Sequence, residues 1–132
     1  MIKADLIAIR DLSPEDHNFI MSTWLIGLFY GKSWYSEVPK AVFMKNYHKV
    51  IEFILSKSKV KIACLKDTPY VILGYAVMND SVLHWVFIKK SWRGIGLAKD
   101  LIPSSINTVT HLTKVGLSII KKKNWTFDPF QI

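Results

Sequence analysis

Three apolar segments between residues 59 and 88 constrain the fold more than any other feature of the sequence. They cover residues 59–65, 70–78 and 82–88, and short breaks at residues 66–69 and 79–81 separate them. Segments of this length that are rich in β-branched and aromatic residues and bounded by turn-forming residues are typical of β-strands. Connections of three or four residues are too short for a crossover between parallel strands. The sequence therefore predicts an antiparallel meander.

Helical patterns precede this meander. Residues 13–16, Ser-Pro-Glu-Asp, have the composition of a helix start, with a capping serine, a first-turn proline and acids at the positive end of the dipole. Apolar residues at helical spacing follow as far as Gly31, and a second apolar helical face begins after Pro39. Residues 3–10 alternate in polarity, which predicts an initial strand.

The chain after residue 88 predicts a short helix, a strand, a further helix and a final strand. These cover residues 96–102, 108–112, 114–123 and 125–130, and Pro103 ends the first of them. The whole order is β-α-α-β-β-β-α-β-α-β. It predicts an α+β fold in which a mixed, mostly antiparallel sheet of about six strands is flanked by about four helices. A length of 132 residues, half of them apolar, indicates a single domain over residues 1–132.

A basic turn with two glycines joins the third meander strand to the next helix. Gly94 and Gly96 lack the Cβ atoms that would hold an anion away from the backbone, and the start of a helix leaves N–H groups unpaired. The turn therefore predicts an anion site, in which the main chain of residues 92–98 holds a phosphate and Arg93 adds positive charge. A plain strand-to-helix turn is the alternative interpretation.

The sequence of this turn, SWRGIGLA at residues 91–98, resembles the coenzyme A loop of the GNAT acyltransferases, Gln/Arg-x-x-Gly-x-Gly/Ala. The order of elements also matches over the whole chain, although Ser91 replaces the usual Gln or Arg and one terminal strand is missing. The resemblance implies the GNAT fold, in a trimmed or small phage-type version, and transfer of an acyl group from acetyl-CoA or another acyl-CoA to an unidentified amine. It also implies a cofactor site that consists of Phe87, Ile88, Trp92, Arg93, Gly94, Ile95, Gly96, Leu97 and Ala98.

Acyl transfer to an amine needs a general base, an oxyanion stabiliser and an acid for the departing thiolate. The resemblance places His84 where the family often has a glutamate base, and an imidazole with a pKa near neutrality can serve in that role. A histidine satisfied by neighbouring backbone is the alternative. The family's tyrosine acid is absent, because Ile120 stands at its position. Ser118 and His111 are the candidate acids, unless the thiolate leaves unaided or the protein does not catalyse a reaction.

Two adjacent aromatic residues, Trp34 and Tyr35, lie between the first two predicted helices. In the GNAT fold this connection borders the acceptor pocket, so the resemblance implies that both rings stack on the substrate. The alternative is that they cover the hydrophobic core.

The formal charge of +8 is concentrated near the glycine turn, since residues 89–123 contain eight basic residues and one acidic residue. Such a field attracts polyanions, either CoA or a nucleic acid. Lys121, Lys122 and Lys123 would alternatively complement the C-terminal dipole of a helix. The charge thus supports a second function, a nucleic-acid-directed base-modifying protein of the Mom type, in which Trp34 and Tyr35 stack on bases. A third is a GNAT-shaped binding module without turnover.

Other classes of protein find little support in the sequence. Cys64 is the single cysteine, so an internal disulfide is impossible and a reducing, cytoplasmic location is expected. Charges interrupt residues 1–5, and the longest apolar stretch is too short to span a membrane. The four histidines are isolated in the sequence, so no metal site is expected. Neither a nucleophile elbow nor a phosphate-binding P-loop motif is present.

Overall fold

The computed structural model describes residues 3–31 and 33–132, except for the side chains of Lys114 and Val115. The first two residues of the charged N-terminal segment, and Lys32 between the first two helices, lie outside the described residues, and so does the charged group of Lys114. The described part of the chain contains six strands: β1 Ile7–Asp11, β2 Lys59–Leu65, β3 Ile72–Asn79, β4 Val82–Ile88, β5 Thr108–Val109 and β6 Thr126–Phe127. It also contains four α-helices: α1 His17–Phe29, α2 Lys40–Lys57, α3 Leu97–Leu101 and α4 Lys114–Lys123.

The six strands form one mixed sheet in the order β1-β2-β3-β4-β5-β6. Neighbours from β1 to β4 are antiparallel, whereas β4–β5 and β5–β6 are parallel. This arrangement confirms the predicted α+β class, the meander and the order of elements.

Several strand boundaries differ from the prediction. The strand predicted at residues 70–78 covers Ile72–Asn79, because Tyr70 and Val71 belong to the turn that precedes it. Residues 3–6 form a 3-10 turn instead of strand, because β2 ends at Leu65, opposite Ile7, and no strand lies beside the earlier residues. The strand predicted at residues 108–112 stops at Val109, where β4 and β5 diverge. The strand predicted at residues 125–130 contains only two residues and is followed by Pro129, which has no N–H to donate.

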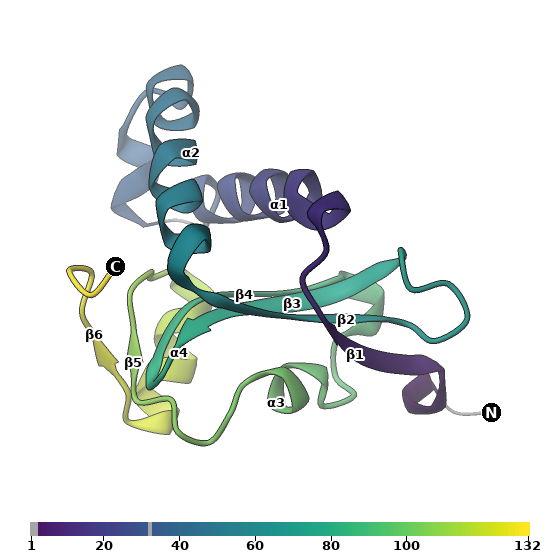
Figure 1. The fold of residues 1–132 in the computed structure, drawn as a ribbon. Coiled ribbons are helices and arrows are strands. Elements are labelled where there is room, and N and C mark those ends of the chain that lie inside the picture. The colour runs from purple at the N-terminus through teal and green to yellow at the C-terminus, as the bar shows by residue number, and fades with distance from the viewer. Residues whose placement is uncertain (1–2, 32) are drawn as a thin grey trace.

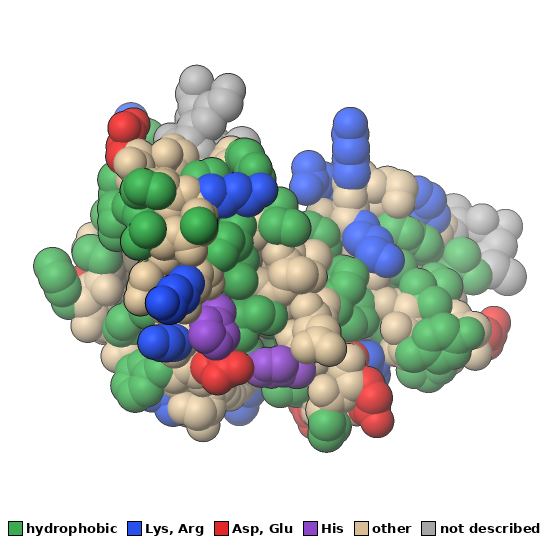
Figure 2. Space-filling model, turned by 90° about the horizontal axis from the view of Figure 1, so that it is seen from above, with side chains coloured by type: hydrophobic (Ala, Val, Ile, Leu, Met, Phe, Trp, Pro, Cys, Tyr) green, Lys and Arg blue, Asp and Glu red, His purple; other side chains and the backbone are tan. Residues whose placement is uncertain are grey.

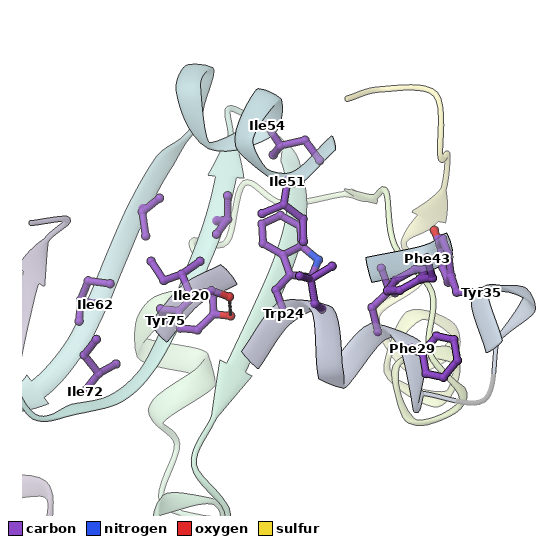
Figure 3. Close-up of a cluster of buried hydrophobic side chains, with 14 of the residues drawn as sticks. Ile20, Trp24, Phe29, Tyr35, Phe43, Ile51, Ile54, Ile62, Ile72 and Tyr75 are labelled. Atoms are coloured by element: carbon purple, nitrogen blue, oxygen red, sulfur yellow. Dashed lines mark hydrogen bonds between the residues drawn. The ribbon is translucent and has the colours of Figure 1, made fainter. Parts of the chain in front are cut away.

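The helices cover the two faces of the sheet in pairs. In Figure 1, α1 and α2 lie over one face and α3 and α4 lie over the other. The core beneath α1 and α2 is rich in aromatic side chains, as Figure 3 shows, and the Tyr75 hydroxyl within it donates a hydrogen bond to the Ile20 carbonyl at 3.1 Å. The predicted apolar face of α2 is confirmed at Phe43, Ile51 and Ile54, which are buried in this core.

The predicted helix start at residues 13–16 is present, although these residues first form a 3-10 turn that leads into α1. Asp16 is buried and accepts two hydrogen bonds from the Arg10 guanidinium, at 2.7 and 2.9 Å. It also accepts one from the Ser13 backbone N–H at 2.8 Å. These bonds hold the pKa of Asp16 below its usual value, with the Arg10 hydrogen bonds as the main cause. Strand β1 and the start of α1 are thereby joined.

Figure 2 shows the molecule from the side of α1 and α2, where basic and hydrophobic side chains are interspersed. The basic side chains on this view are scattered and do not form one continuous face. Within residues 3–31 and 33–132, the helices lack the combination of length and apolar character that a bilayer span requires.

Candidate active site

The candidate site begins where β4 and β5 separate. The two parallel strands pair only at Val82–Thr108 and Leu83–Val109, and the Thr110 N–H then donates to the Leu83 carbonyl at 3.2 Å. Beyond this point a cavity of about 810 Å³ opens between β4, α3, β5 and α4. Its polar and charged lining residues are His84, Lys99, Ser104, Asn107, His111, Thr113, Lys123 and Asn124.

A β-bulge in β4 faces this separation. On β3, Val77 and Met78 are consecutive, but their partners on β4 are Trp85 and Leu83, so His84 has no partner across the ladder. The extra residue turns its neighbours to opposite sides: Leu83 packs toward α3 and Trp85 packs toward α1. Bulges re-aim side chains at the edges of binding sites. Here the bulged residue itself lines the cavity.

Trp85, one of the residues that line the cavity, packs its ring against α1 on the opposite face of the sheet. Its ring lies parallel to that of Trp24, with a centroid separation of 5.9 Å and an interplanar angle of 6°. Gly27 of α1 leaves room for it, because a Cβ atom at that position would lie 3.0 Å from Cζ2 of Trp85. The cavity wall is therefore fixed by packing on the opposite face of the sheet.

The predicted glycine turn encloses a second, smaller hollow of about 140 Å³. Ile88, Trp92, Arg93, Gly94, Gly96, Leu97 and Ala98 line it. Both glycines have φ of +83°, which L side chains rarely adopt, and a Cβ atom on either would meet nothing within 4 Å. The backbone conformation accounts for the glycines, and the space beside them is open. Ala98 lines both this hollow and the larger cavity.

The backbone of the turn differs from the prediction at two residues. The N–H groups of Trp92 and Arg93 donate to the carbonyls of Lys89 and Lys90, at 2.9 and 3.3 Å, so they are not available to a phosphate. Within the described structure, the N–H groups of residues 94–98 have no hydrogen-bond acceptor. Arg93 donates from Nε to the Ile88 carbonyl at 3.0 Å, which anchors its guanidinium at the end of β4. The available amides are thus those from Gly94 onward.

A chain of hydrogen bonds leads away from His84 into the protein. His84 Nδ1 lies 2.9 Å from Thr110 Oγ1, which lies 2.8 Å from His111 Nδ1. His111 Nε2 then lies 2.6 Å from the hydroxyl oxygen of Tyr47, on α2. The other ring nitrogen of His84, Nε2, is buried and has no hydrogen-bond partner among the described residues. His84 therefore has one ring nitrogen bonded within the protein and one, the buried Nε2, whose hydrogen-bonding capacity is unused among the described residues.

Both histidines are neutral at physiological pH. Burial lowers the pKa of His84 to about 4, and the positive charge of Lys57 contributes. Burial also lowers the pKa of His111 to about 3, with a smaller contribution from His84. The expectation of a near-neutral pKa for His84 is therefore wrong, because its ring is almost completely removed from solvent. Burial likewise raises the pKa of the Tyr47 hydroxyl.

The other predicted site residues are distributed unevenly. Ile88 lines the small hollow, whereas Phe87 packs against Phe19 and Tyr75 on the opposite face of the sheet. Ile95, more than a third exposed, is outside the lining of both spaces. Ser118 is exposed and is also outside the lining, whereas Ile120 contributes to the large cavity.

The aromatic pair between α1 and α2 is divided in the structure. Trp34 is 60% exposed, but Tyr35 is only 2% exposed and its ring packs against Tyr47 and Phe43. Tyr35 therefore belongs to the core, and stacking on a substrate remains a prediction for Trp34 alone.

Thr110 and Tyr47 are site residues that the sequence did not reveal. Thr110 was one polar position in a predicted strand, and Tyr47 was one member of the apolar face of α2. Tyr47 is 64 residues from His111 in the chain, so no local motif could have connected them. Within residues 3–31 and 33–132, no cluster of three or more His, Cys, Asp or Glu side chains could hold a metal ion.

Solved structures with a similar fold include proteins named as putative, predicted or GCN5-related acetyltransferases. Neither a protein-family model nor a curated protein matches the sequence. The chain is similar to a putative acetyl transferase from Pyrococcus furiosus, with TM-score 0.62 and 12% identity over 96% of this chain and 97% of that one. It is also similar to a predicted acetyltransferase with acetyl-CoA from Clostridium acetobutylicum, with TM-score 0.61 and 13% identity over 96% and 94%.

Some proteins with this fold are considerably longer. A GCN5-related N-acetyltransferase from Rhodopseudomonas palustris matches with TM-score 0.51 and 18% identity, over 73% of this chain and 61% of that one. The chain thus spans less than two thirds of the length of that protein. At these identities the comparisons establish the fold, which is that of the GCN5-related N-acetyltransferases, as predicted.

Proposed function

We propose that the protein is an acyl-CoA-dependent N-acyltransferase, with acetyl-CoA as the expected donor and an amine as the acceptor. One observation carries the proposal: the large cavity at the separation of β4 and β5 and the glycine-lined hollow are neighbours that share Ala98 in their linings. The GNAT fold supports it further. A long ligand with a phosphate-bearing end and an apolar arm suits two neighbouring spaces of this kind.

The residues present fit such a ligand. The backbone N–H groups of residues 94–98 would hold the diphosphate, with charge from Arg93, in the space that both glycines leave open. The larger cavity is lined mainly by apolar side chains from β4, α3 and α4, which would hold the pantetheine arm. Lys99 and Lys123 add positive charge to its lining.

When bound, an acyl-CoA supplies an acyl group as a thioester. His84 is the residue that would exchange a proton or a hydrogen bond with the reacting groups, because its Nε2 is unpaired among the described residues and the residue lines the cavity. His111 also lines the cavity, but both of its ring nitrogens have protein partners. An acyl-CoA substrate also suits a cytoplasmic location.

A thermal-shift experiment with acetyl-CoA, CoA and duplex DNA, each at two salt concentrations, tests the proposal. A ligand at roughly one hundred times its dissociation constant stabilises the folded state by about 2.7 kcal/mol. We expect stabilisation by acetyl-CoA and CoA in the wild type. A Gly94→Ala and Gly96→Ala double variant should show much weaker stabilisation at the same ligand concentration.

Other outcomes would contradict the proposal. A steeply salt-dependent response to DNA alone would favour the nucleic-acid-directed function. Stabilisation by CoA without any acetylation of a broad panel of amines would favour the binding module. If no CoA compound stabilises the folded protein, the enzyme assignment loses its basis.

Catalysis is tested separately with a His84→Gln variant. Loss of a group that exchanges a proton or a hydrogen bond with the reacting atoms typically costs about a hundredfold or more in rate. We expect such a loss in kcat with near-normal stabilisation by CoA. A folded variant with full activity would remove His84 from the reaction.

A further inference from the structure

The chain of hydrogen bonds behind His84 has a direction, and that direction decides what His84 presents to the cavity. A neutral imidazole has one N–H donor and one acceptor nitrogen, and a hydroxyl has one hydrogen to donate. Whether His84 Nε2 carries a hydrogen is therefore linked, through these successive hydrogen bonds, to the direction in which the Tyr47 hydroxyl points its own hydrogen.

Thr110 limits the possible arrangements to two. Its side chain is 1% exposed, and the two Nδ1 atoms are the partners that the described contacts provide for its hydroxyl. A hydroxyl that uses its hydrogen in one of these two contacts donates to one Nδ1 and accepts from the other, and the His111 ring also hydrogen-bonds to the backbone of His84. Either all donors point from Tyr47 toward His84, or all of them point the other way.

The first arrangement gives His84 an Nε2–H group. Tyr47 donates to His111 Nε2, His111 donates from Nδ1 to Thr110, and Thr110 donates to His84 Nδ1. The reverse arrangement gives His84 a lone pair at Nε2. It requires His111 to donate to Tyr47, and Tyr47 to donate onward to the neighbouring hydroxyl of Tyr35.

The bond between Tyr47 and His111 distinguishes these arrangements. Its length of 2.6 Å is close to the values of about 2.7–2.8 Å found for hydroxyl donors and shorter than the usual 2.9–3.0 Å for N–H donors to oxygen. A phenol is also a stronger donor than an imidazole N–H, and an imidazole nitrogen is a good acceptor. Both facts favour Tyr47 as the donor.

We propose that Tyr47 orients this chain, through His111 and Thr110, so that His84 presents an N–H donor and not a lone pair to the cavity. Tyr47, His111 and Thr110 are then positioning residues, and His84 alone would touch the substrate. The inference rests on the proposed function only for its consequence in catalysis. That consequence reverses the expectation that His84 is the general base.

An N–H donor in the cavity recognises a hydrogen-bond acceptor, such as the carbonyl oxygen of a thioester. A neutral imidazole with a strongly lowered pKa is suited to this role, because its N–H group can polarise a carbonyl by donating a hydrogen bond while the ring stays neutral.

The test is the ¹⁵N NMR spectrum of the histidine side chains in the protein alone, at pH 7.5 and without any CoA compound. We expect His84 to be protonated at Nε2 and unprotonated at Nδ1, with the reverse pattern at His111. The signals are assigned by comparison with the His84→Gln variant. A lone pair at His84 Nε2 would overturn the proposal directly, whether or not any variant folds.

A Tyr47→Phe variant sharpens the test, since it removes the donor and keeps the ring. We expect the two histidines to shift toward the opposite tautomers, and kcat to fall roughly tenfold with little change in the KM for acetyl-CoA. Tyr70→Phe, at a residue that is 79% exposed, is the control and should change neither measurement. Unchanged tautomers in a folded Tyr47→Phe protein would show that Tyr47 does not orient the chain.

The NMR spectrum tests the orientation of the hydrogen-bond chain and the thermal shift tests the proposed function, so either proposal can be refuted without the other. Absence of CoA binding with the expected tautomers would refute the proposed function and keep the orientation of the chain. CoA binding with the reverse tautomers would keep the function and refute the orientation.

Discussion

The two ends of β4 offer different chemistry to the same ligand. Near its start, His84 is buried and begins a hydrogen-bond chain that runs through Thr110 and His111, just after β5, to Tyr47 on α2. Just after its end, the glycine turn is exposed, and its chemistry depends on main-chain N–H groups and one arginine. The first site is made by side chains from distant segments, and the second by a local backbone conformation.

The two sites should therefore respond differently to amino-acid substitution. A buried polar chain is costly to interrupt, because each unsatisfied group loses its hydrogen bond without regaining water. An open turn tolerates substitution in the folded state but loses the shape that admits a ligand. Variants at the start of β4 should therefore affect stability and rate, whereas variants after its end should affect mainly affinity.

The largest expected effect on stability follows from replacing Thr110, the central residue of the hydrogen-bond chain. Thr110→Val removes the hydroxyl and leaves one or both Nδ1 atoms without a partner, at about 1–3 kcal/mol for each. We expect the free energy of unfolding, measured with urea, to fall by about 2–5 kcal/mol. Thr110→Ser retains the hydroxyl and should lose about 1 kcal/mol, as for a single methyl group. Equal losses in both variants would mean that the hydrogen bonds contribute little.

Acid should weaken the same end of β4. The folded-state pKa values of His84 and His111 lie well below the unfolded value of 6.5, so the unfolded chain binds more protons between these limits. Stability from the neutral histidines is complete above pH 6.5 and is lost as the pH falls toward 4. Urea titrations at pH 7 and pH 5 measure this loss. A His111→Gln variant should show a smaller dependence, and an unchanged dependence would assign it to other groups.

Substitutions in the glycine turn should have a smaller effect on stability. A Cβ at Gly94 or Gly96 meets no atom within 4 Å, so the cost is the left-handed backbone, about 1–2 kcal/mol for each residue. The same Cβ atoms enter the space proposed for the diphosphate, and we expect the affinity for CoA to fall at least about tenfold, or 1.4 kcal/mol. Calorimetric titration with CoA measures it. Full affinity in a Gly96→Ala protein would move the diphosphate elsewhere.

The smallest effect on stability is expected at Trp34, which is 60% exposed. Trp34→Ala should change the free energy of unfolding by no more than about 0.5 kcal/mol, which is usual for exposed positions. If the ring stacks on the acceptor, turnover of the amine should change much more than the affinity for CoA. Equal changes in both quantities would indicate a general disturbance of the fold.

Much of the fold could be predicted from the sequence because the patterns that indicate it are local. The meander between residues 59 and 88, the helix start at residues 13–16 and the two-glycine turn each depend on neighbours in the chain. Positive φ at Gly94 and Gly96 is a property of the turn itself. Strand ends were predicted less well, because a strand stops where its partner does. Strand β5 is an example, since it ends where β4 bulges at His84.

The amino-acid sequence alone determined the order of elements, the glycine turn and the presence of a histidine near the start of β4, since hydrophobic period and backbone preference act over a few residues. Tertiary structure decided what that histidine does. It buried His84, lowered its pKa and brought Thr110 and Tyr47 to it from other elements. The physical reason is that hydrogen-bond direction and desolvation depend on atoms that meet only after the sheet and the helices have packed.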